Sequence, residues 1–472
     1  MKRTKIVATL GPSSSDAAVL ESMLHAGVNV FRVNFSHGSH EQHRGTIQTI
    51  RGILDRTGMT AAILADLQGP KLRVGNVEEG AIVNPGDRVT FTNQKCEGTK
   101  QRVYMTYTEF PNDVNPGETI LLDDGKLMMR VISTNRKDEV VAEVVQGGPL
   151  KSKKGVNLPN TRVSLPCLTE KDLADLKVAM EEGVDWIGLS FVRNAQDIKE
   201  LRTILNKNKN SAGIVAKIEK PEAVSDIERI LDETDGVMVA RGDLGVEVPL
   251  ESVPMIQKMI VAKAVERAKP VIVATQMMES MIDSMTPSRA EVNDVANAVL
   301  DGADAVMLSG ETSVGKYPVE VVATMAKIVA AAETSSINHI KERKPKKNDE
   351  RFVNNAICYQ AAKMANLVEA NAIATLTFSG YSAQLISSFR PKSNIYAFTS
   401  NRAILNKISL YWGVRGFYYD GMVSTDQSMM DITQKLREEK LVEEGDYIIQ
   451  LGSMPIQKRG TTNTMRIKKV GE

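Results

Sequence analysis

Residues 214–219 read IVAKIE, an apolar run that carries one lysine and one carboxylate near its end. Valine and isoleucine favour a β-strand, and side chains two residues apart on a strand share one face. Lys217 and Glu219 are therefore expected on the same side of a buried strand. An ion pair at the rim of a core would explain the segment if it stood alone. The pattern recurs, however, since RGD (241–243) closes the next apolar run and TQ (275–276) closes the one after it.

Short apolar runs alternate with amphipathic stretches on both sides of this segment, which predicts a parallel α/β architecture. Helices are expected at 169–182 and 288–300, because each stretch begins at a Ser or Thr N-cap and stops at glycine. Eight strand-helix units specify a TIM (β/α)8 barrel. The eight strands are expected at 4–9, 28–34, 61–66, 184–191, 213–219, 235–241, 270–275 and 303–309.

The connection after the third strand lacks a helical pattern. Residues 70–166 are rich in Val, Thr and Ile and are broken by turn signals at 85–87, 115–117 and 123–125. They predict an all-β domain inserted into the barrel, which then comprises residues 1–69 and 167–340. A domain inserted at the active face of a barrel is a candidate lid.

The region after the barrel divides into two parts. Residues 341–351, KERKPKKNDER, are charged and interrupted by proline, which predicts a surface linker. Residues 352–472 return to α/β alternation, with strands near 371–378, 394–399 and 446–451. We expect a third, doubly wound α/β domain there.

Composition excludes several classes of partner. With 59 basic against 58 acidic residues, the chain has no general attraction for nucleic acid. No apolar run approaches the roughly 18 residues of a membrane-spanning helix, and the N-terminus does not read as a signal peptide. Three scattered cysteines indicate neither a disulfide framework nor a zinc site. A soluble cytoplasmic protein is expected.

Charged and polar residues follow most of the expected barrel strands. Catalytic groups of TIM barrels lie at the carboxyl ends of the strands, so these side chains are expected to meet on one rim. They are Arg32, Asn34, Ser36 and His37 after the second strand, Asp66, Gln68, Lys71 and Arg73 after the third, Lys217 and Glu219 on the fifth, and Arg241, Asp243, Thr275, Gln276, Ser309 and Glu311 after the sixth to eighth.

Glu219 and Asp243 form a pair of carboxylates on neighbouring expected strands. Oxygen ligands without His or Cys suit Mg²⁺ and not zinc. Arg32, Arg73 and Lys217 would surround such an ion with positive charge, which favours a phosphorylated ligand. There is no Walker-type loop and no dinucleotide fingerprint, which excludes a P-loop kinase.

Across nearly its whole length the chain resembles the pyruvate kinases. The shared motifs occur in the family's order and are too many for chance agreement. They are TKIV (4–7) with GP (11–12), NFSHG (34–38), KGVNLP (154–159), KIE (217–219), MVARGDLG (238–245), ATQM (274–277) and LSGET (308–312).

The resemblance implies a catalytic barrel, an inserted β-barrel lid, a C-terminal regulatory domain and a homotetramer. It also implies transfer of the phosphoryl group of phosphoenolpyruvate to ADP, giving pyruvate and ATP in the last step of glycolysis. The implied roles are as follows: Glu219 and Asp243 bind Mg²⁺ or Mn²⁺, Lys217 stabilises the phosphoryl group in flight, Arg32 binds substrate phosphate, Arg73 and Lys154 bind nucleotide phosphates, the Gly242 backbone and Thr275 hold the substrate carboxylate, and Thr275, Ser309 and Glu311 relay a proton to the enolate.

At one implied site, the pocket for a monovalent cation, the chain departs from the common family pattern. The pocket corresponds to Asn34, Ser36, Asp66 and the backbone carbonyl of residue 67. Lys71 stands where a glutamate is usual, and Leu67 lacks the hydroxyl of the common threonine. The ammonium of Lys71 would supply the charge of K⁺, so we expect activity that does not require K⁺.

A second implied site is a loop for phosphorylated effectors in the C-terminal domain, formed by Thr377, Ser379, Gly380 and Ser382. Hydroxyls and amides at a helix N-terminus suit a phosphate, although an ordinary helix cap has nearly the same chemistry. Phe378 and Tyr381 replace residues that are often polar. We therefore expect a sugar or nucleoside monophosphate in place of fructose 1,6-bisphosphate.

Two functions of other classes are kept as alternatives. A catalytically idle metabolite sensor would lack Lys217, Glu219 or Asp243, and all three are present. A Mg²⁺-dependent aldolase would leave the inserted domain and Lys154 unexplained.

Overall fold

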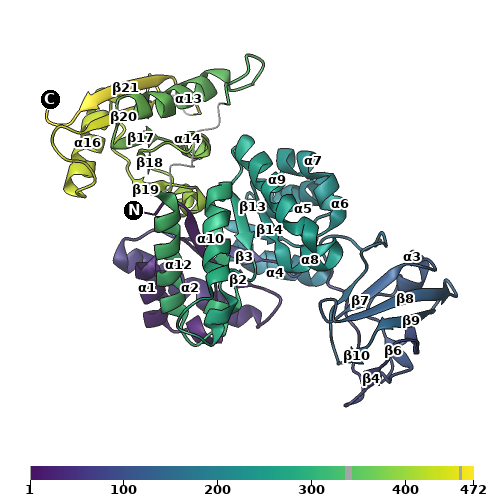
Figure 1. Cartoon of the computed structure of the whole chain (residues 1–472). Coiled ribbons are helices and arrows are strands. Elements are labelled where there is room, and N and C mark those ends of the chain that lie inside the picture. The colour runs from purple at the N-terminus through teal and green to yellow at the C-terminus, as the bar shows by residue number, and fades with distance from the viewer. Residues whose placement is uncertain (1, 335–342, 457–459) are drawn as a thin grey trace.

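The computed structural model describes residues 2–334, 343–456 and 460–472. Eight parallel strands close into a barrel in the order β1-β16-β15-β14-β13-β12-β3-β2, which confirms the predicted TIM fold (Figure 1). Each strand lies within the range expected from the sequence. The strands are β1 (Lys5–Thr9), β2 (Val30–Asn34), β3 (Ala62–Asp66), β12 (Trp186–Leu189), β13 (Gly213–Ile218), β14 (Gly236–Ala240), β15 (Val271–Ala274) and β16 (Ala305–Leu308).

Helices surround the barrel, and the two predicted from capping signals are confirmed. Thr169 caps α4 and Ser288 caps α10 through side-chain hydrogen bonds, and α10 ends at Gly302 in the left-handed region. The helices of ten or more residues are α1 (Ala17–Ala26), α2 (His40–Thr57), α4 (Glu170–Glu181), α5 (Ala195–Lys207), α9 (Val253–Glu266), α10 (Arg289–Asp301) and α12 (Pro318–Glu333), and the seven-residue α7 (Ile227–Glu233) lies between α5 and α9 in the chain. Shorter helical segments are η1 (Pro12–Ser14), α6 (Pro221–Ser225), α8 (Arg241–Glu247), η2 (Leu250–Ser252), η3 (Glu279–Ile282) and α11 (Gly310–Ser313).

The insertion after β3 is all-β, apart from the single turn α3 (Phe110–Asp113). Its strands form a six-stranded sheet, β11-β7-β8-β9-β5-β6, and a separate two-stranded sheet, β10-β4, with isolated bridges beside them. It therefore has two sheets where one barrel was expected. The strands are β4 (Ile82–Val83), β5 (Arg88–Thr92), β6 (Arg102–Tyr104), β7 (Thr119–Leu122), β8 (Leu127–Thr134), β9 (Glu139–Gln146), β10 (Gly148–Pro149) and β11 (Val156–Asn157).

The C-terminal region is α/β, with a five-stranded sheet in the order β19-β18-β17-β20-β21. Three strands were expected; β19 (Val414–Tyr418) and the antiparallel edge strand β21 (Thr464–Lys469) were missed, because charged residues interrupt their apolar pattern. The linker prediction lies partly outside the described residues. The remaining elements are α13 (Phe352–Leu367), β17 (Ala372–Leu376), α14 (Tyr381–Ser388), β18 (Asn394–Thr399), α15 (Arg402–Lys407), η4 (Ile408–Leu410), α16 (Thr425–Glu438) and β20 (Tyr447–Gly452).

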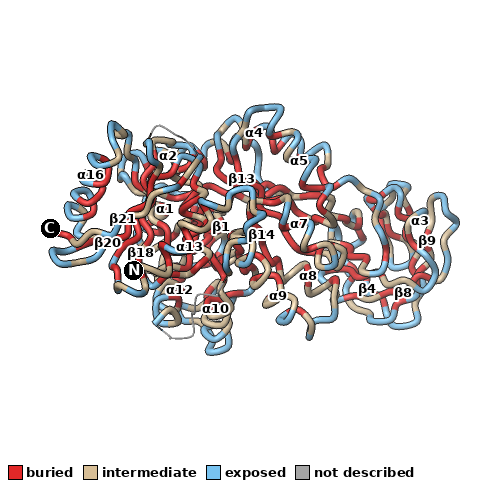
Figure 2. Tube along the Cα trace, turned by 90° about the horizontal axis from the view of Figure 1, so that it is seen from above, coloured by how far each residue is buried: buried red, intermediate tan, exposed pale blue. Residues whose placement is uncertain are grey.

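The C-terminal domain covers the floor of the barrel. Interior barrel residues such as Ile272 and C-terminal residues such as Ile395 belong to one buried cluster. Buried segments accordingly run from the barrel into the C-terminal sheet (Figure 2). Lys5 donates to the Val414 carbonyl at 2.7 Å across this boundary, and burial lowers the pKa of Lys5 to about 8.

The insertion lies on the far side of the barrel from the C-terminal domain (Figure 1). The chain leaves the barrel for it after β3, at the carboxyl end of that strand. This end is the active face of a TIM barrel, whereas the floor is closed by the C-terminal domain. None of the described helices is both long and apolar enough to span a membrane.

Candidate active site

Lys217 and Glu219 share one face of β13, as the alternation predicted. The Lys217 ammonium lies 3.0 Å from the Glu219 carboxylate and 3.2 Å from Asp66 on β3, and all three side chains are buried. Burial lowers the pKa of Lys217, but the charges of Asp66 and Glu219 outweigh it, so the pKa is raised overall. The lysine is therefore held as an ammonium inside the barrel mouth.

Asp66 joins two cations that are far apart in the sequence. Besides Lys217, it accepts hydrogen bonds from Arg32, with Nε at 2.7 Å and Nη2 at 2.6 Å. A third Arg32 nitrogen donates to Thr9 at 2.9 Å. Burial raises the pKa of Asp66, but the two cations reverse this and lower it, so the carboxylate stays ionised.

Glu219 and Asp243 are the carboxylates expected to bind a metal. Burial and the nearby Asp243 raise the pKa of Glu219, against the charge of Lys217. A cation beside Glu219 would offset the cost of its buried charge. Among the described residues there is no group of three or more His, Cys, Asp or Glu suited to a metal. Two carboxylates alone fit Mg²⁺, which keeps several positions for water and substrate oxygens.

Thr275 lies in a strained turn after β15. Thr275 and Gln276 have φ of 69° and 53°, a region that costs non-glycine residues about 1–3 kcal/mol each. The Thr275 hydroxyl accepts a hydrogen bond from the Gly242 amide at 2.8 Å. Thr275 and Gly242, both predicted to contact the substrate, are thus adjacent in the structure.

Arg241 holds this turn, a role that the sequence analysis did not assign. Its guanidinium donates to the carbonyls of Ala274 and Thr275 at 3.1 and 2.6 Å. Asp294 on α10 fixes the guanidinium through two contacts of 2.8 Å. The strained backbone conformation at Thr275 is therefore stabilised by Arg241, which Asp294 holds in a bidentate ion pair.

Ser309 and Glu311 follow β16 on the same rim. Glu311 is buried and accepts from the Met278 and Ser309 amides at 3.0 and 2.6 Å. Burial raises the pKa of Glu311. The Ser309 hydroxyl oxygen is buried without a hydrogen-bond partner in the described part of the chain.

A cleft of about 840 Å³ separates the insertion from the barrel, and Arg73, His37, Ser36 and Tyr104 contribute to its lining. Arg73 donates to the Lys153 carbonyl at 3.0 Å. Lys154, predicted to bind nucleotide phosphates, lies in the insertion and pairs with Asp123 at 2.9 Å. Its neighbour Lys153, to which no role was assigned, lines the cleft.

Residues of the implied monovalent-cation pocket are engaged with their neighbours. The Asn34 side chain accepts from the Ser36 amide at 3.1 Å, and the Leu67 carbonyl accepts from the Ser190 hydroxyl at 2.7 Å. The Lys71 ammonium lies 3.7 Å from Asp243, one of the two carboxylates expected to bind a metal.

Two parts of this chain match models of known protein families. Residues 1–322 match the family model of the pyruvate kinase barrel domain, and residues 355–468 match that of the pyruvate kinase alpha/beta domain. This chain belongs to the pyruvate kinase family. It is accordingly a glycolytic phosphotransferase, and the sensor and aldolase alternatives are set aside.

Individual relatives align over the full chain. The pyruvate kinase of Staphylococcus epidermidis is 43% identical over 474 residues, covering all of this chain and 81% of that protein. That of Corynebacterium glutamicum is 42% identical over 476 residues, covering 98% of that protein. The crystal structure of a pyruvate kinase from Cryptosporidium parvum has a TM-score of 0.92 at 35% identity, covering 99% of this chain and 96% of that one.

Proposed function

We propose that Lys217, Glu219 and Asp243 together catalyse phosphoryl transfer from phosphoenolpyruvate to ADP. The observation that carries this proposal is a buried ammonium in contact with one buried carboxylate, next to a second carboxylate that is 32% exposed. Phosphoryl transfer needs positioning and electrostatic stabilisation more than covalent help from the protein. A Mg²⁺ or Mn²⁺ ion held by Glu219 and Asp243 would neutralise phosphate oxygens, and the Lys217 ammonium meets the charge that develops in transfer.

The same rim suits the rest of the substrate. Arg32 is the proposed phosphate contact, and the Gly242 amide with Thr275 is the proposed site of the substrate carboxylate. A carboxylate that accepts from the Gly242 amide would replace the present bond to the Thr275 hydroxyl. Thr275, Ser309 and Glu311 then surround the position where the enolate needs a proton. Arg73 and Lys154 are the proposed nucleotide-phosphate contacts.

A coupled assay of ATP formation from phosphoenolpyruvate and ADP tests the proposal. The unmodified chain should form ATP only when Mg²⁺ or Mn²⁺ is added, and the Glu219→Gln and Asp243→Asn variants should bind Mn²⁺ more weakly by electron paramagnetic resonance. An unmodified chain that forms no ATP, or variants that bind Mn²⁺ normally, would contradict the proposed roles.

We further propose that the enzyme does not require K⁺, because Lys71 places a permanent cation within 3.7 Å of Asp243. Only part of the lysine side chain, 32%, is exposed. A second cation next to the ammonium would be repelled by about 4 kcal/mol at 4 Å and an effective dielectric of 20.

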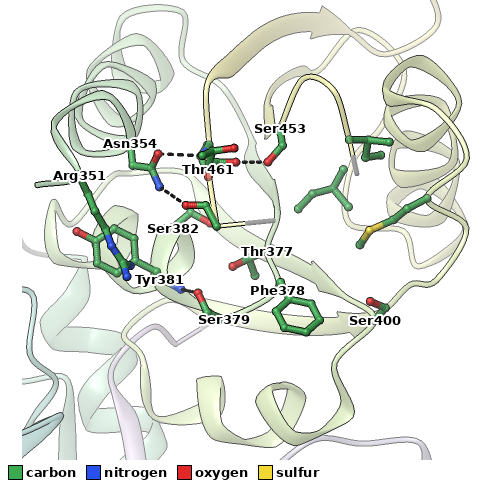
Figure 3. Close-up of a pocket in the computed structure, with 15 residues that line it drawn as sticks. Arg351, Asn354, Thr377, Phe378, Ser379, Tyr381, Ser382, Ser400, Ser453 and Thr461 are labelled. Atoms are coloured by element: carbon green, nitrogen blue, oxygen red, sulfur yellow. Dashed lines mark hydrogen bonds between the residues drawn. The ribbon is translucent and has the colours of Figure 1, made fainter. Parts of the chain in front are cut away.

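A cavity of about 260 Å³ in the C-terminal domain is the proposed effector site (Figure 3). Thr377, Ser379 and Ser382 line it, and the Gly380 amide donates to the Thr377 hydroxyl at 3.0 Å. Arg351 also lines it, stacked over the Tyr381 ring at 4.6 Å. Among the described residues that line the cavity, Arg351 is the one cation, and together with the hydroxyls and the half-exposed Phe378 ring it favours one phosphate and a ring, as in a sugar or nucleoside monophosphate.

Such a monophosphate is expected to shift the half-saturating phosphoenolpyruvate concentration about fivefold or more, the usual range of allosteric coupling. Arg351→Ala should abolish the shift. Arg402→Ala is the matched control, because Arg402 stacks on Tyr418 at 4.1 Å outside the cavity lining. If glucose 6-phosphate, ribose 5-phosphate and AMP all leave the half-saturating phosphoenolpyruvate concentration unchanged, the loop is an ordinary helix cap and not an effector site.

A homotetramer is proposed from two sets of exposed apolar side chains. One set lies on segments that follow barrel strands, and the other lies on α13, β20 and β21, where β21 is a sheet edge in the described chain. Two separate self-complementary surfaces suit a tetramer built from dimers. The sets are Leu250, Met255, Met285, Val292 and Val314 on the barrel, and Val353, Leu367, Tyr447 and Ile467 on the C-terminal domain.

Sedimentation velocity should show four chains per particle at micromolar concentration. Ile467→Lys places a charge on the β21 edge and is expected to reduce the particle to a dimer, whereas Lys137→Glu, an exposed change on the insertion, should leave it intact. A monomeric unmodified chain would refute the proposal.

The domain limits 1–69 with 167–340, 70–166 and 352–472 are retained as proposals. They are supported by β3 ending at Asp66 and α4 beginning at Glu170.

A cytoplasmic location is proposed as well, since Cys167 and Cys358 are free thiols buried in their cores.

A further inference from the structure

The turn after β12 carries two residues that the sequence analysis left without a role. Ser190 is buried, with 1% of its surface exposed. Its hydroxyl oxygen accepts a hydrogen bond from the Lys217 ammonium at 2.7 Å and donates one to the Leu67 carbonyl at 2.7 Å. A serine hydroxyl has one proton. Because that proton points at Leu67, the oxygen lone pairs face Lys217.

Phe191, the next residue, reaches the metal side of the same site. Its amide donates to the Glu219 carboxylate at 2.6 Å. Its φ of 53° is in the left-handed region, which is costly for an aromatic residue and is found where surrounding structure holds it. Two consecutive residues of one strained turn thus contact the two functional side chains of β13.

The turn also touches both connections to the insertion. Gly69 begins the outgoing connection, and a Cβ atom on it would lie 2.9 Å from the Ser190 Cβ and 2.9 Å from the Phe191 ring. Cys167 ends the returning connection, with its sulfur 3.4 Å from the Ser190 carbonyl oxygen. The Ser190–Phe191 turn therefore packs against both connections between the barrel and the insertion.

We propose that Ser190 is a positioning residue that fixes the Lys217 ammonium for phosphoryl transfer, an inference that rests on the proposed function of Lys217. The Lys217 ammonium donates a hydrogen bond to Ser190 and forms ion pairs with Asp66 and Glu219. The two carboxylates attract the cation from two sides, and the hydroxyl supplies the neutral third acceptor that sets its position between them. Phe191 holds the Glu219 carboxylate from the same turn, so the spacing of ammonium and metal ligand is set by one structural unit.

Ser190→Ala is expected to lower kcat by about 10- to 100-fold, since small misplacements of reacting groups have effects of this size. KM for phosphoenolpyruvate should change less than threefold, because Ser190 is not proposed to touch substrate. The loss of kcat at alkaline pH should begin at lower pH, since the ammonium loses an acceptor that favours its charged form. Ser190→Cys keeps the size of the side chain but is a weak acceptor, and it should behave like Ser190→Ala.

Ser387→Ala is the matched control. Ser387 is equally buried, at 2%, and donates to the Trp412 carbonyl at 2.7 Å in the C-terminal domain, away from Lys217. It should match the unmodified enzyme in kcat and pH profile while losing similar thermal stability. Each variant is assayed only after it is shown to be folded and in the same oligomeric state as the unmodified chain. Mn²⁺ binding is measured beside activity.

Three results separate the possibilities. Loss of kcat with a shifted pH profile in both Ser190 variants, and not in Ser387→Ala, supports the inference. Unchanged kcat in Ser190→Ala, or a Cys variant as active as the unmodified enzyme, overturns it and leaves the role of Lys217 intact. An unmodified chain that forms no ATP overturns the proposed function and this inference with it.

Discussion

Lys217→Ala is expected to lower kcat by about 10²- to 10³-fold, the usual effect of removing one group that stabilises transition-state charge. The ammonium lies 3.0 Å from the proposed metal ligand Glu219, inside the barrel mouth. Affinity for phosphoenolpyruvate should stay broadly intact, because Arg32, Gly242 and Thr275 remain. A fall in kcat without a matching rise in KM is the pattern of an interaction made mainly in the transition state.

Steady-state kinetics together with calorimetric titration of phosphoenolpyruvate in the presence of Mg²⁺ measures both quantities. Removing the cation also leaves Asp66 and Glu219 short of a buried partner, so thermal unfolding is recorded for each variant. Lys5→Ala is a suitable control, since Lys5 is a buried lysine at the barrel floor whose ammonium donates a hydrogen bond to the Val414 carbonyl. Near-normal turnover by folded Lys217→Ala would remove the lysine from the mechanism.

The unmodified enzyme is expected to work without K⁺, and Lys71→Glu is expected to make its activity depend on K⁺. The substitution removes the ammonium beside Asp243 and adds a carboxylate, a change of two charge units at one position. The site then lacks the positive charge that the lysine supplied, and a monovalent cation would be attracted where it was repelled before. At an effective dielectric of 20, each of the two charge units changes the interaction with a cation at 4 Å by about 4 kcal/mol, or roughly a thousandfold in affinity per unit.

Assays in tetramethylammonium buffer with and without 100 mM K⁺, on the order of physiological ionic strength, distinguish the outcomes. The unmodified enzyme should show equal rates, and Lys71→Glu should be slow until K⁺ is added. Lys137→Glu makes the same charge change on an exposed position of the insertion and should respond to neither condition. Strong stimulation of the unmodified enzyme by K⁺ would show that Lys71 does not replace the ion.

Much of the barrel could be predicted because each strand carries its own local signal. Apolar runs of four to six residues, each followed by polar residues and a helix, appear in the chain without knowledge of partners. The sharing of one face by Lys217 and Glu219 is equally local, since it follows from the two-residue period of a strand. The edge strand β21 was missed because it lacks such a local signal. Charged residues interrupt its apolar pattern, and it forms a strand by pairing with β20.

The contacts that organise the site depended on barrel closure. Asp66 on β3 meets Lys217 on β13 because β12 alone separates these strands, although 151 residues separate the two in the sequence. Ser190 and Arg241 likewise act on residues of other strands, and nothing in their own neighbourhoods distinguishes them from ordinary polar residues at strand ends.

By itself, the sequence determined the eight barrel strands, their order along the chain, and which residue types reach the active rim. Tertiary structure alone decided which of those residues share protons and charges: Asp66 with Arg32 and Lys217, Ser190 with Lys217, and Lys71 with Asp243. The physical reason is range. Strand formation and side-chain alternation are set by neighbours in the chain, whereas ion pairs and buried hydrogen bonds need atoms within about 4 Å, which only the closed barrel brings together.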